Sequence, residues 1–219
     1  MMIKNVFVVK HPLCCHNLSI IRDKNTTAEV FRNAVKRITY LLFYKATEDL
    51  ELEDKEVETP LETCVTKTLS SKKEVIIAPI LRAGLIFSDI ANDIMPFATV
   101  RHIGMYRDEQ TLQPVWYYNK IPVEFAHPEN EIILILDPML ATGNSAIEAI
   151  KLFVNKKVPQ KNIKFVSLIS APEGLEKVHE KYPDVQIITA SIDKCLNDSG
   201  YIRPGLGDAG DRIFNTVEN

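Results

Sequence analysis

The sequence has 219 residues, of which 46% are hydrophobic and 25% charged, and its formal net charge is −3 at pH 7. This length and near-average composition predict a single domain over residues 1–219, large enough to bury a sizeable core. The acidic balance leaves no basic field to hold a polynucleotide, so we expect a small-molecule substrate and no nucleic-acid partner.

Export and membrane signals are not apparent in the chain. The longest purely aliphatic run, residues 132–136, is far shorter than the roughly 20 residues that span a bilayer. The apolar residues 6–9 are too few for a secretory signal core. We therefore expect a cytoplasmic protein without a membrane partner.

Cysteine and histidine residues gather near the N-terminus but lack the spacing of a disulfide framework or a zinc site. The four cysteines show no CxxC pair, and in a chain of this length they are interpreted as reduced thiols. A second ligand pair at finger-like spacing is missing, so no metal site is predicted. The residues concerned are Cys14, Cys15, Cys64, Cys195, His11 and His16.

The N-terminal third predicts helices. Residues 26–50 place apolar side chains at helical spacing, and Asp23 or Asn25 is a candidate cap. The acidic residues 48–58 suggest a solvated connection, and residues 59–69 predict a second helix opened by a proline.

The rest of the chain alternates strands and helices. Two β-like runs, residues 99–106 and 115–121, flank the polar residues 107–114 and predict a long β-hairpin arm. Continuous apolar strands alternating with helices predict an α/β fold with a mostly parallel central sheet flanked by helices. In such sheets ligands bind at the carboxyl ends of the strands. The predicted buried strands are residues 74–79, 131–136, 164–169 and 186–192, with helices after the first three, near 85–94, 145–155 and from 172.

The loop after the strand at residues 131–136 carries a candidate phosphate site. It reads DPMLATGNS, so that a carboxylate, Asp137, ends the strand and small hydroxyl residues lead into a helix. Backbone N–H groups there, with the hydroxyls of Thr142 and Ser145, can cradle a phosphate, and Asp137 can accept from two ribose hydroxyls. A helix with an ordinary capped N-terminus explains the same residue types. Both interpretations stand on spacing alone.

The tail contains a match to the dinucleotide fingerprint GxGxxG at residues 205–210. Its context excludes a dinucleotide fold, because Pro204 interrupts the approach and only nine residues follow Gly210. The glycines instead favour a loop that brings its backbone close to a flat ligand.

Several segments resemble one family in order along the chain. DPMLATGNS is similar to the phosphoribosyl pyrophosphate (PRPP) motif of uracil phosphoribosyltransferases, and further matches are HPL, PILRAGL, YRDE and GYIRPGLGDAGDR, at residues 11–13, 79–85, 106–109 and 200–212. The resemblance implies a type I phosphoribosyltransferase fold with a C-terminal base-binding hood, and conversion of uracil and PRPP to UMP and pyrophosphate. It also implies Mg²⁺ carried mainly by PRPP, and we expect a homodimer or larger homo-oligomer.

The resemblance also assigns residues. Catalytic roles fall to Arg82, Arg107 and Asp208, and guanidinium forks suit pyrophosphate oxygens. A surface ion pair is the alternative for each arginine; for Arg82, its place between an apolar strand and Gly84 argues against it. The residues expected to bind PRPP are Arg82, Arg107, Asp137, Pro138, Met139, Leu140, Ala141, Thr142, Gly143, Asn144, Ser145 and Asp208. Those expected to bind uracil are Tyr201, Ile202, Gly207, Asp208 and Ala209; Tyr201 has a packing role as its alternative.

Two positions depart from the family pattern. Asn144 and Asn215 stand where glycines are usual, and asparagine tolerates positive φ well enough to preserve the loop shape. The family's reaction needs no protein nucleophile, so catalysis is expected to be electrostatic and positional. The alternative function is a non-catalytic sensor of PRPP or nucleotides on the same fold, against which the intact tail and the negative net charge argue.

Overall fold

The structure is a computed structural model that describes residues 3–107 and 114–216. Within these residues, nine strands form one sheet in the order β1-β11-β10-β8-β4-β6-β7, with β5 beside β4 and β9 beside β10. All pairings in the sheet are parallel except β6 with β7. The predicted α/β fold with a mostly parallel sheet is confirmed.

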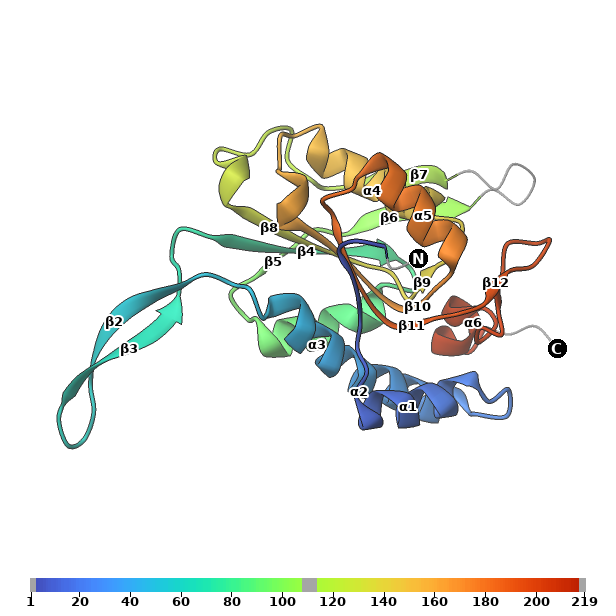
Figure 1. The fold of residues 1–219 in the computed structure, drawn as a ribbon, viewed down its shortest axis with the longest axis horizontal. Helices are drawn as coiled ribbons and strands as arrows, with labels where there is room; N and C mark the ends of the chain where they lie inside the picture. Colours follow the sequence, from blue (N-terminus) through green and yellow to red (C-terminus); the bar gives the residue numbers. More distant parts are fainter. Residues whose placement is uncertain (1–2, 108–113, 217–219) are drawn as a thin grey trace.

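The elements follow in chain order, and Figure 1 shows their arrangement. They are β1 (Val6–Val8), α1 (Pro12–Arg22), α2 (Ala28–Thr47), β2 (Leu52–Glu58), β3 (Thr63–Leu69), β4 (Glu74–Leu81), α3 (Leu85–Ile94), β5 (Thr99–Val100), β6 (Ile103–Arg107), β7 (Pro114–Asn119), β8 (Glu131–Leu136), β9 (Met139–Leu140), α4 (Asn144–Val154), β10 (Ile163–Ser170), α5 (Pro172–Lys181), β11 (Gln186–Ile192), β12 (Cys195–Leu196), β13 (Ile202–Arg203) and α6 (Ala209–Phe214), with 3₁₀ turns at Pro128–Asn130 and Gln160–Asn162.

Helices cover both faces of the sheet (Figure 1). One core packs α1, α2, α3 and α6 against one face, and the other core packs α4 and α5 against the opposite face. Burial on both faces explains why five of the eight residues of β10 are apolar, and all eight are buried. The carboxyl ends of β4, β8 and β10 therefore lie at one edge, where the loops of interest emerge.

The prediction for residues 48–69 was wrong. The segment forms an antiparallel hairpin of β2 and β3, paired from Leu52 opposite Leu69 to Glu58 opposite Thr63, and it stands away from the body (Figure 1). Both strands are largely exposed. Without a buried face, the sequence shows no period-2 alternation of apolar residues from which to recognise a strand.

Three smaller corrections concern helix starts and strand lengths. The cap of α2 is Thr27, whose Oγ1 accepts a hydrogen bond from Val30 N at 3.5 Å, rather than Asp23 or Asn25. The helix α1, which the periodicity analysis did not include, begins with a proline after the side-chain cap His11. The predicted hairpin of residues 99–121 is confirmed as β6 and β7, but β5 is separate from β6.

Candidate active site

The loop of residues 137–145 joins the carboxyl end of β8 to the N-terminus of α4. Gly143 has a φ of +80°, and a Cβ there would lie 3.0 Å from the Gly174 carbonyl oxygen, so the turn needs glycine for both reasons. The N–H groups of the first turn of α4 point toward this loop, as in any α-helix, and the Gly143 cap has no side chain to accept hydrogen bonds from them. An anion placed there meets several donors and the positive end of the helix.

Asp137 is the half-buried carboxylate that begins this loop. Its Oδ1 accepts a hydrogen bond from Met139 N at 3.3 Å. Burial raises the pKa of Asp137 to about 7; the Met139 N–H opposes that shift, and the negative charge of Asp208 adds to it. The tail carboxylate is therefore close enough to act on Asp137 electrostatically, although the two residues lie far apart in the sequence.

The PILRAGL segment, residues 79–85, includes the end of β4 and packs closely against the end of β8. A Cβ on Gly84 would lie 2.4 Å from the Leu136 carbonyl oxygen. The Arg82 side chain is 62% exposed, lies 3.9 Å from Asp211, and has its guanidinium 5.7 Å from the centre of the Phe214 ring. The argument from a buried charge was therefore wrong for Arg82, because its charge is solvated and points to the tail.

The tail, residues 200–212, forms a loop and then α6. Gly205 and Gly207 have φ values of +62° and +81°, which confirms that the glycines serve a turn and not a βαβ unit. Asp208 caps α6, because its Oδ1 accepts from Asp211 N at 2.9 Å. A cavity of about 460 Å³ borders the loop, and Lys24 and Arg212 also line it.

The structure brings most of the predicted site residues to one end of the sheet. The tail lies against the PILRAGL loop, since a Cβ on Gly210 would be 4.0 Å from the Ala83 Cβ. Ile202 and Ala209 are buried, whereas Tyr201 is 41% exposed. Arg107 is the last residue of β6. Its side chain and residues 108–113, which include Asp108 and Glu109 of the YRDE motif, lie outside the described part of the chain.

The two asparagines that replace family glycines behave differently. Asn215 adopts the left-handed conformation with φ 57° at the end of α6, as the sequence predicts. Asn144 is the first residue of α4, and its Oδ1 accepts from Lys177 Nζ at 2.5 Å. The positive φ of this loop falls on Gly143 instead, so tolerance of positive φ does not explain Asn144.

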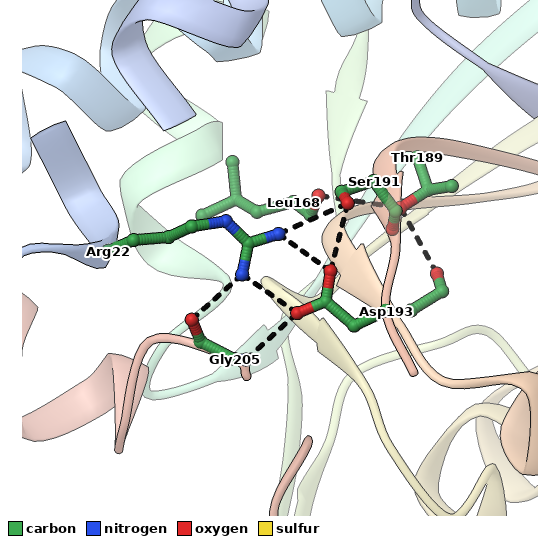
Figure 2. A network of polar contacts seen from close by, with 7 residues as sticks. Arg22, Leu168, Thr189, Ser191, Asp193 and Gly205 are labelled. Atoms are coloured by element: carbon green, nitrogen blue, oxygen red, sulfur yellow. Dashed lines mark hydrogen bonds and ion pairs between the residues drawn. The ribbon is translucent and has the colours of Figure 1, made fainter. Parts of the chain in front are cut away.

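Sequence reasoning missed one polar network at the base of the tail. Asp193, Arg22 and Gly205 are joined by hydrogen bonds (Figure 2), although Arg22 and Asp193 are separated by 171 positions. Neither residue lies in a resembling motif, and no local spacing signals a contact over that separation.

Three further observations concern the chain outside the site. All four cysteines are free. Among the described residues, no cluster of three or more His, Cys, Asp or Glu side chains is arranged to hold a metal ion. None of the helices in that part of the chain has the length and apolar character needed to cross a membrane.

Comparison with known proteins agrees with this geometry. The chain is 50% identical to the uracil phosphoribosyltransferase of Listeria innocua over 97% of its own length and 99% of that protein. It is 52% identical to the enzyme of the same name from Thermoanaerobacter sp., over 98% and 100% of the two chains.

Solved structures share the fold. The AQ2163 protein from Aquifex aeolicus superposes with a TM-score of 0.88 at 37% identity, covering 98% of this chain and all of that one. Adenine phosphoribosyltransferase from Trypanosoma brucei, at 12% identity and a TM-score of 0.57, covers 94% of this chain and 90% of its own and shares the fold alone. The family model for uracil phosphoribosyltransferase matches residues 8–216. The chain therefore belongs to the uracil phosphoribosyltransferase family.

Proposed function

We propose that this chain transfers the ribose 5-phosphate of PRPP to N1 of uracil, giving UMP and pyrophosphate. The observation that carries the proposal is the convergence of three loops at one edge of the sheet. They are residues 82–84, residues 137–145 and the tail. Arg82 lies 3.9 Å from Asp211 of the tail, Gly84 packs on Leu136 directly before the second loop, and burial together with the negative charge of Asp208 raises the pKa of Asp137. Each loop follows the family pattern in sequence.

PRPP is held, in this proposal, across the first two loops and Asp208. The N–H groups at the start of α4 and the hydroxyls of Thr142 and Ser145 bind the 5′-phosphate, while Asp137 accepts hydrogen bonds from the ribose hydroxyls. Arg82 and Arg107 bind the pyrophosphate, for which a planar fork of donors is suited. The loop residues that complete this set are Pro138, Met139, Leu140, Ala141, Gly143 and Asn144.

Uracil is read by the tail. Backbone groups of Ile202, Gly207 and Ala209 meet the edge of the base, and Asp208 lies between the base and PRPP. Support comes from the positive φ of Gly207, which turns the backbone at that point, and from the burial of Ile202 and Ala209, which fixes the ends of the loop. Tyr201 stands beside this edge and is exposed enough to cover the ribose.

The reaction needs charge stabilisation rather than a protein nucleophile. Departure of pyrophosphate leaves positive charge on C1′ and negative charge on the leaving group. Arg82 and Arg107 stabilise the leaving group, and the fixed loops hold uracil N1 on the opposite face of C1′. The carboxylates of Asp137 and Asp208 lie on the side where positive charge develops.

The carboxylates also fit a magnesium ion that is carried by PRPP. Mg²⁺ keeps several waters and is usually bound by one or two carboxylates together with substrate phosphates. Asp137 and Asp208 supply oxygen donors of that kind, while the described residues include no larger acidic cluster. When bound, the ion neutralises pyrophosphate charge.

We propose that the chain is one domain and forms a homodimer or larger homo-oligomer in the cytoplasm. Two cores on opposite faces of one sheet support the single domain. The protruding hairpin exposes Leu61 and Val65 to 95% and 70%, which supports contact with a second copy. Free cysteines support a reducing compartment.

Incubation of the protein with uracil, PRPP and Mg²⁺ tests the proposed function. We expect UMP and pyrophosphate to appear in equal amounts and to depend on PRPP. Tight PRPP binding without any UMP is the result expected of a PRPP-sensing protein, and it would contradict the proposal.

A further inference from the structure

Asp193, directly after β11, is the centre of the polar network at the base of the tail. Its side chain is 3% exposed. It accepts hydrogen bonds from Arg22 Nη1 at 2.8 Å and Nη2 at 2.6 Å, from Ser191 Oγ at 2.9 Å and from Gly205 N at 2.8 Å (Figure 2). A buried carboxylate with this many donors is satisfied on both oxygens.

Arg22, the last residue of α1, binds the other backbone polar group of Gly205. Its Nη1 also donates to the Gly205 carbonyl oxygen at 2.9 Å, and its Nη2 to Ser191 Oγ at 3.1 Å. The ion pair therefore binds both backbone polar groups of Gly205. A Cβ on Gly205 would lie 2.1 Å from the Ile202 carbonyl oxygen, so this point of the tail is packed directly on Ile202.

A second arginine fixes the next residue. Arg212 Nη1 donates to the Leu206 carbonyl oxygen at 2.8 Å and to the Ile21 carbonyl oxygen at 2.5 Å, and its Nη2 donates to the Asp23 carbonyl oxygen at 2.6 Å. Both arginines thus attach the tail to the C-terminal end of α1. The two residues that precede Gly207 are held through their backbone groups.

We propose that the Arg22–Asp193 ion pair positions the base-recognition backbone of the tail, and that it sets the affinity and selectivity for uracil without touching the substrate. The inference rests on the proposed function, in which residues 207–209 read the base. Backbone donors and acceptors discriminate between bases only if their directions are fixed, because the wrong base then leaves buried polar groups unpaired.

A positioning role suits this pair better than a purely stabilising one. Buried ion pairs contribute little net stability compared with apolar packing, but they specify one conformation where their hydrogen bonds are complete. Burial alone would raise the pKa of Asp193, yet the hydrogen bonds from Arg22, Gly205 N–H and Ser191 lower it below its ordinary value. Asp193 is therefore ionised at neutral pH.

The test compares Asp193→Asn with a matched control, Asp49→Asn. The control breaks the ion pair of Asp49 with the buried Lys164. Lys164 lies at the start of β10 and also donates to the Ala46 carbonyl oxygen near the end of α2, so this pair lies at the end of the sheet opposite the tail. We expect Asp193→Asn to lower kcat/KM for uracil by about 10²-fold, the scale for a misplaced reactant. The uracil preference over cytosine should fall as well, while the PRPP dissociation constant from calorimetry changes by much less, because most of the proposed PRPP contacts lie on residues 82–84 and 137–145. Asp49→Asn should lower the melting temperature. It should leave kcat/KM for uracil, the preference for uracil over cytosine and the PRPP dissociation constant unchanged.

Arg22→Lys keeps a cation but cannot hold Asp193 and Gly205 together through a fork. It should cause an intermediate loss in kcat/KM for uracil, again with a much smaller change in PRPP affinity. If Asp193→Asn does not fold, Arg22→Lys replaces it in the test. The double variant Arg22→Lys/Asp193→Asn should be less impaired than the product of the single effects, because the two residues act as one unit.

The outcomes separate this inference from the proposed function. Unchanged uracil kinetics in a folded Asp193→Asn or Arg22→Lys variant, or equal losses of uracil and PRPP affinity, would overturn the positioning role. Asp208→Ala is measured beside them: if it is fully active, the tail does not read the base and the proposed site itself is wrong. Impaired Asp208→Ala with normal Asp193→Asn rejects only the inference.

Discussion

At the scale of single residues, the proposed site depends on the carboxylates of Asp137 and Asp208. Their charges repel, and burial raises the pKa of Asp137 to about 7. A ribose hydroxyl donates well only to the ionised carboxylate, so under the proposed assignment the protonation state of Asp137 controls the affinity for PRPP. A cation bound between PRPP and these carboxylates favours the ionised form.

PRPP affinity should therefore rise as the pH increases from about 6 to about 8. Calorimetry of PRPP binding across this range is the measurement, with Asp137→Asn as the control, since the ionisation of PRPP itself affects both proteins equally. The variant should bind weakly and lose the extra pH dependence. Identical pH profiles for the two proteins would show that Asp137 does not contact PRPP.

The same pKa predicts a stability effect of opposite sign. The folded state retains a proton on Asp137 up to about pH 7, whereas the unfolded chain loses it near 3.8. The free energy of unfolding should therefore fall as pH rises through this window. Melting temperatures of the unliganded protein, compared with Asp137→Asn, measure it; a wild-type curve parallel to that of the variant would contradict the raised pKa.

Arg82 tests the stabilisation of the leaving group. Arg82→Ala should lower kcat/KM by roughly 10² to 10³, the scale for losing one oriented charge stabiliser, and Arg82→Lys should restore only part of it. Lys151→Ala is the control, because Lys151 forms an exposed ion pair with Glu148 on α4, and its activity should stay normal. A fully active Arg82→Ala would make the Arg82–Asp211 contact an ordinary surface pair.

At the scale of elements, the proposed phosphate site is the N-terminus of α4. The sharp turn is made by Gly143, so the neighbouring Asn144 needs no unusual backbone conformation and instead links α4 to α5 through Lys177. This explains how a family glycine is replaced without loss of the loop.

Asn144→Gly should leave PRPP affinity unchanged or tighten it, because the N–H donors remain and Lys177 is released. The free energy of unfolding should fall by up to about 1 kcal/mol, since glycine is a poor helix former. Chemical denaturation and PRPP calorimetry measure the two effects. A large drop in affinity would mean that the Asn144 side chain itself contacts the ligand.

Most elements with a buried face could be predicted from the sequence, although α1, which buries Cys14, Leu18 and Ile21, was not. The strands β4, β8, β10 and β11 are rich in apolar residues because helices cover both faces, and each is a short apolar run, which is typical of a buried strand. The β2–β3 hairpin has no buried face, and the sequence analysis therefore predicted a connection and a helix opened by a proline in its place. The Arg22–Asp193 contact depends on tertiary packing over 171 positions, which no local pattern encodes.

At the scale of the whole molecule, the loops that follow β4 and β8 lie at the same edge of the sheet, whereas the β2–β3 hairpin extends away from the body (Figure 1). A two-stranded hairpin is marginally stable alone in water. Its exposed Leu61 and Val65 therefore favour burial against a second copy of the chain.

The double substitution Leu61→Lys/Val65→Lys should lower the molar mass measured by light scattering if this hairpin holds the homo-oligomer together. A matched pair on the same hairpin, Glu62→Lys/Thr63→Lys, adds positive charge at exposed positions without removing a large apolar side chain and should leave the mass unchanged. A wild-type protein that is monomeric at all concentrations would contradict the oligomer proposal.

The central claim is that a fixed backbone in the tail selects uracil for transfer to PRPP. Uracil presents a carbonyl at position 4 and an N–H at position 3, and cytosine inverts both. Sites that pair such groups reject the wrong partner by about 10⁴-fold or more. The direct measurement is kcat/KM for uracil and for cytosine with saturating PRPP and Mg²⁺. The account predicts strong turnover of uracil and almost none of cytosine, and comparable values for the two bases would contradict it.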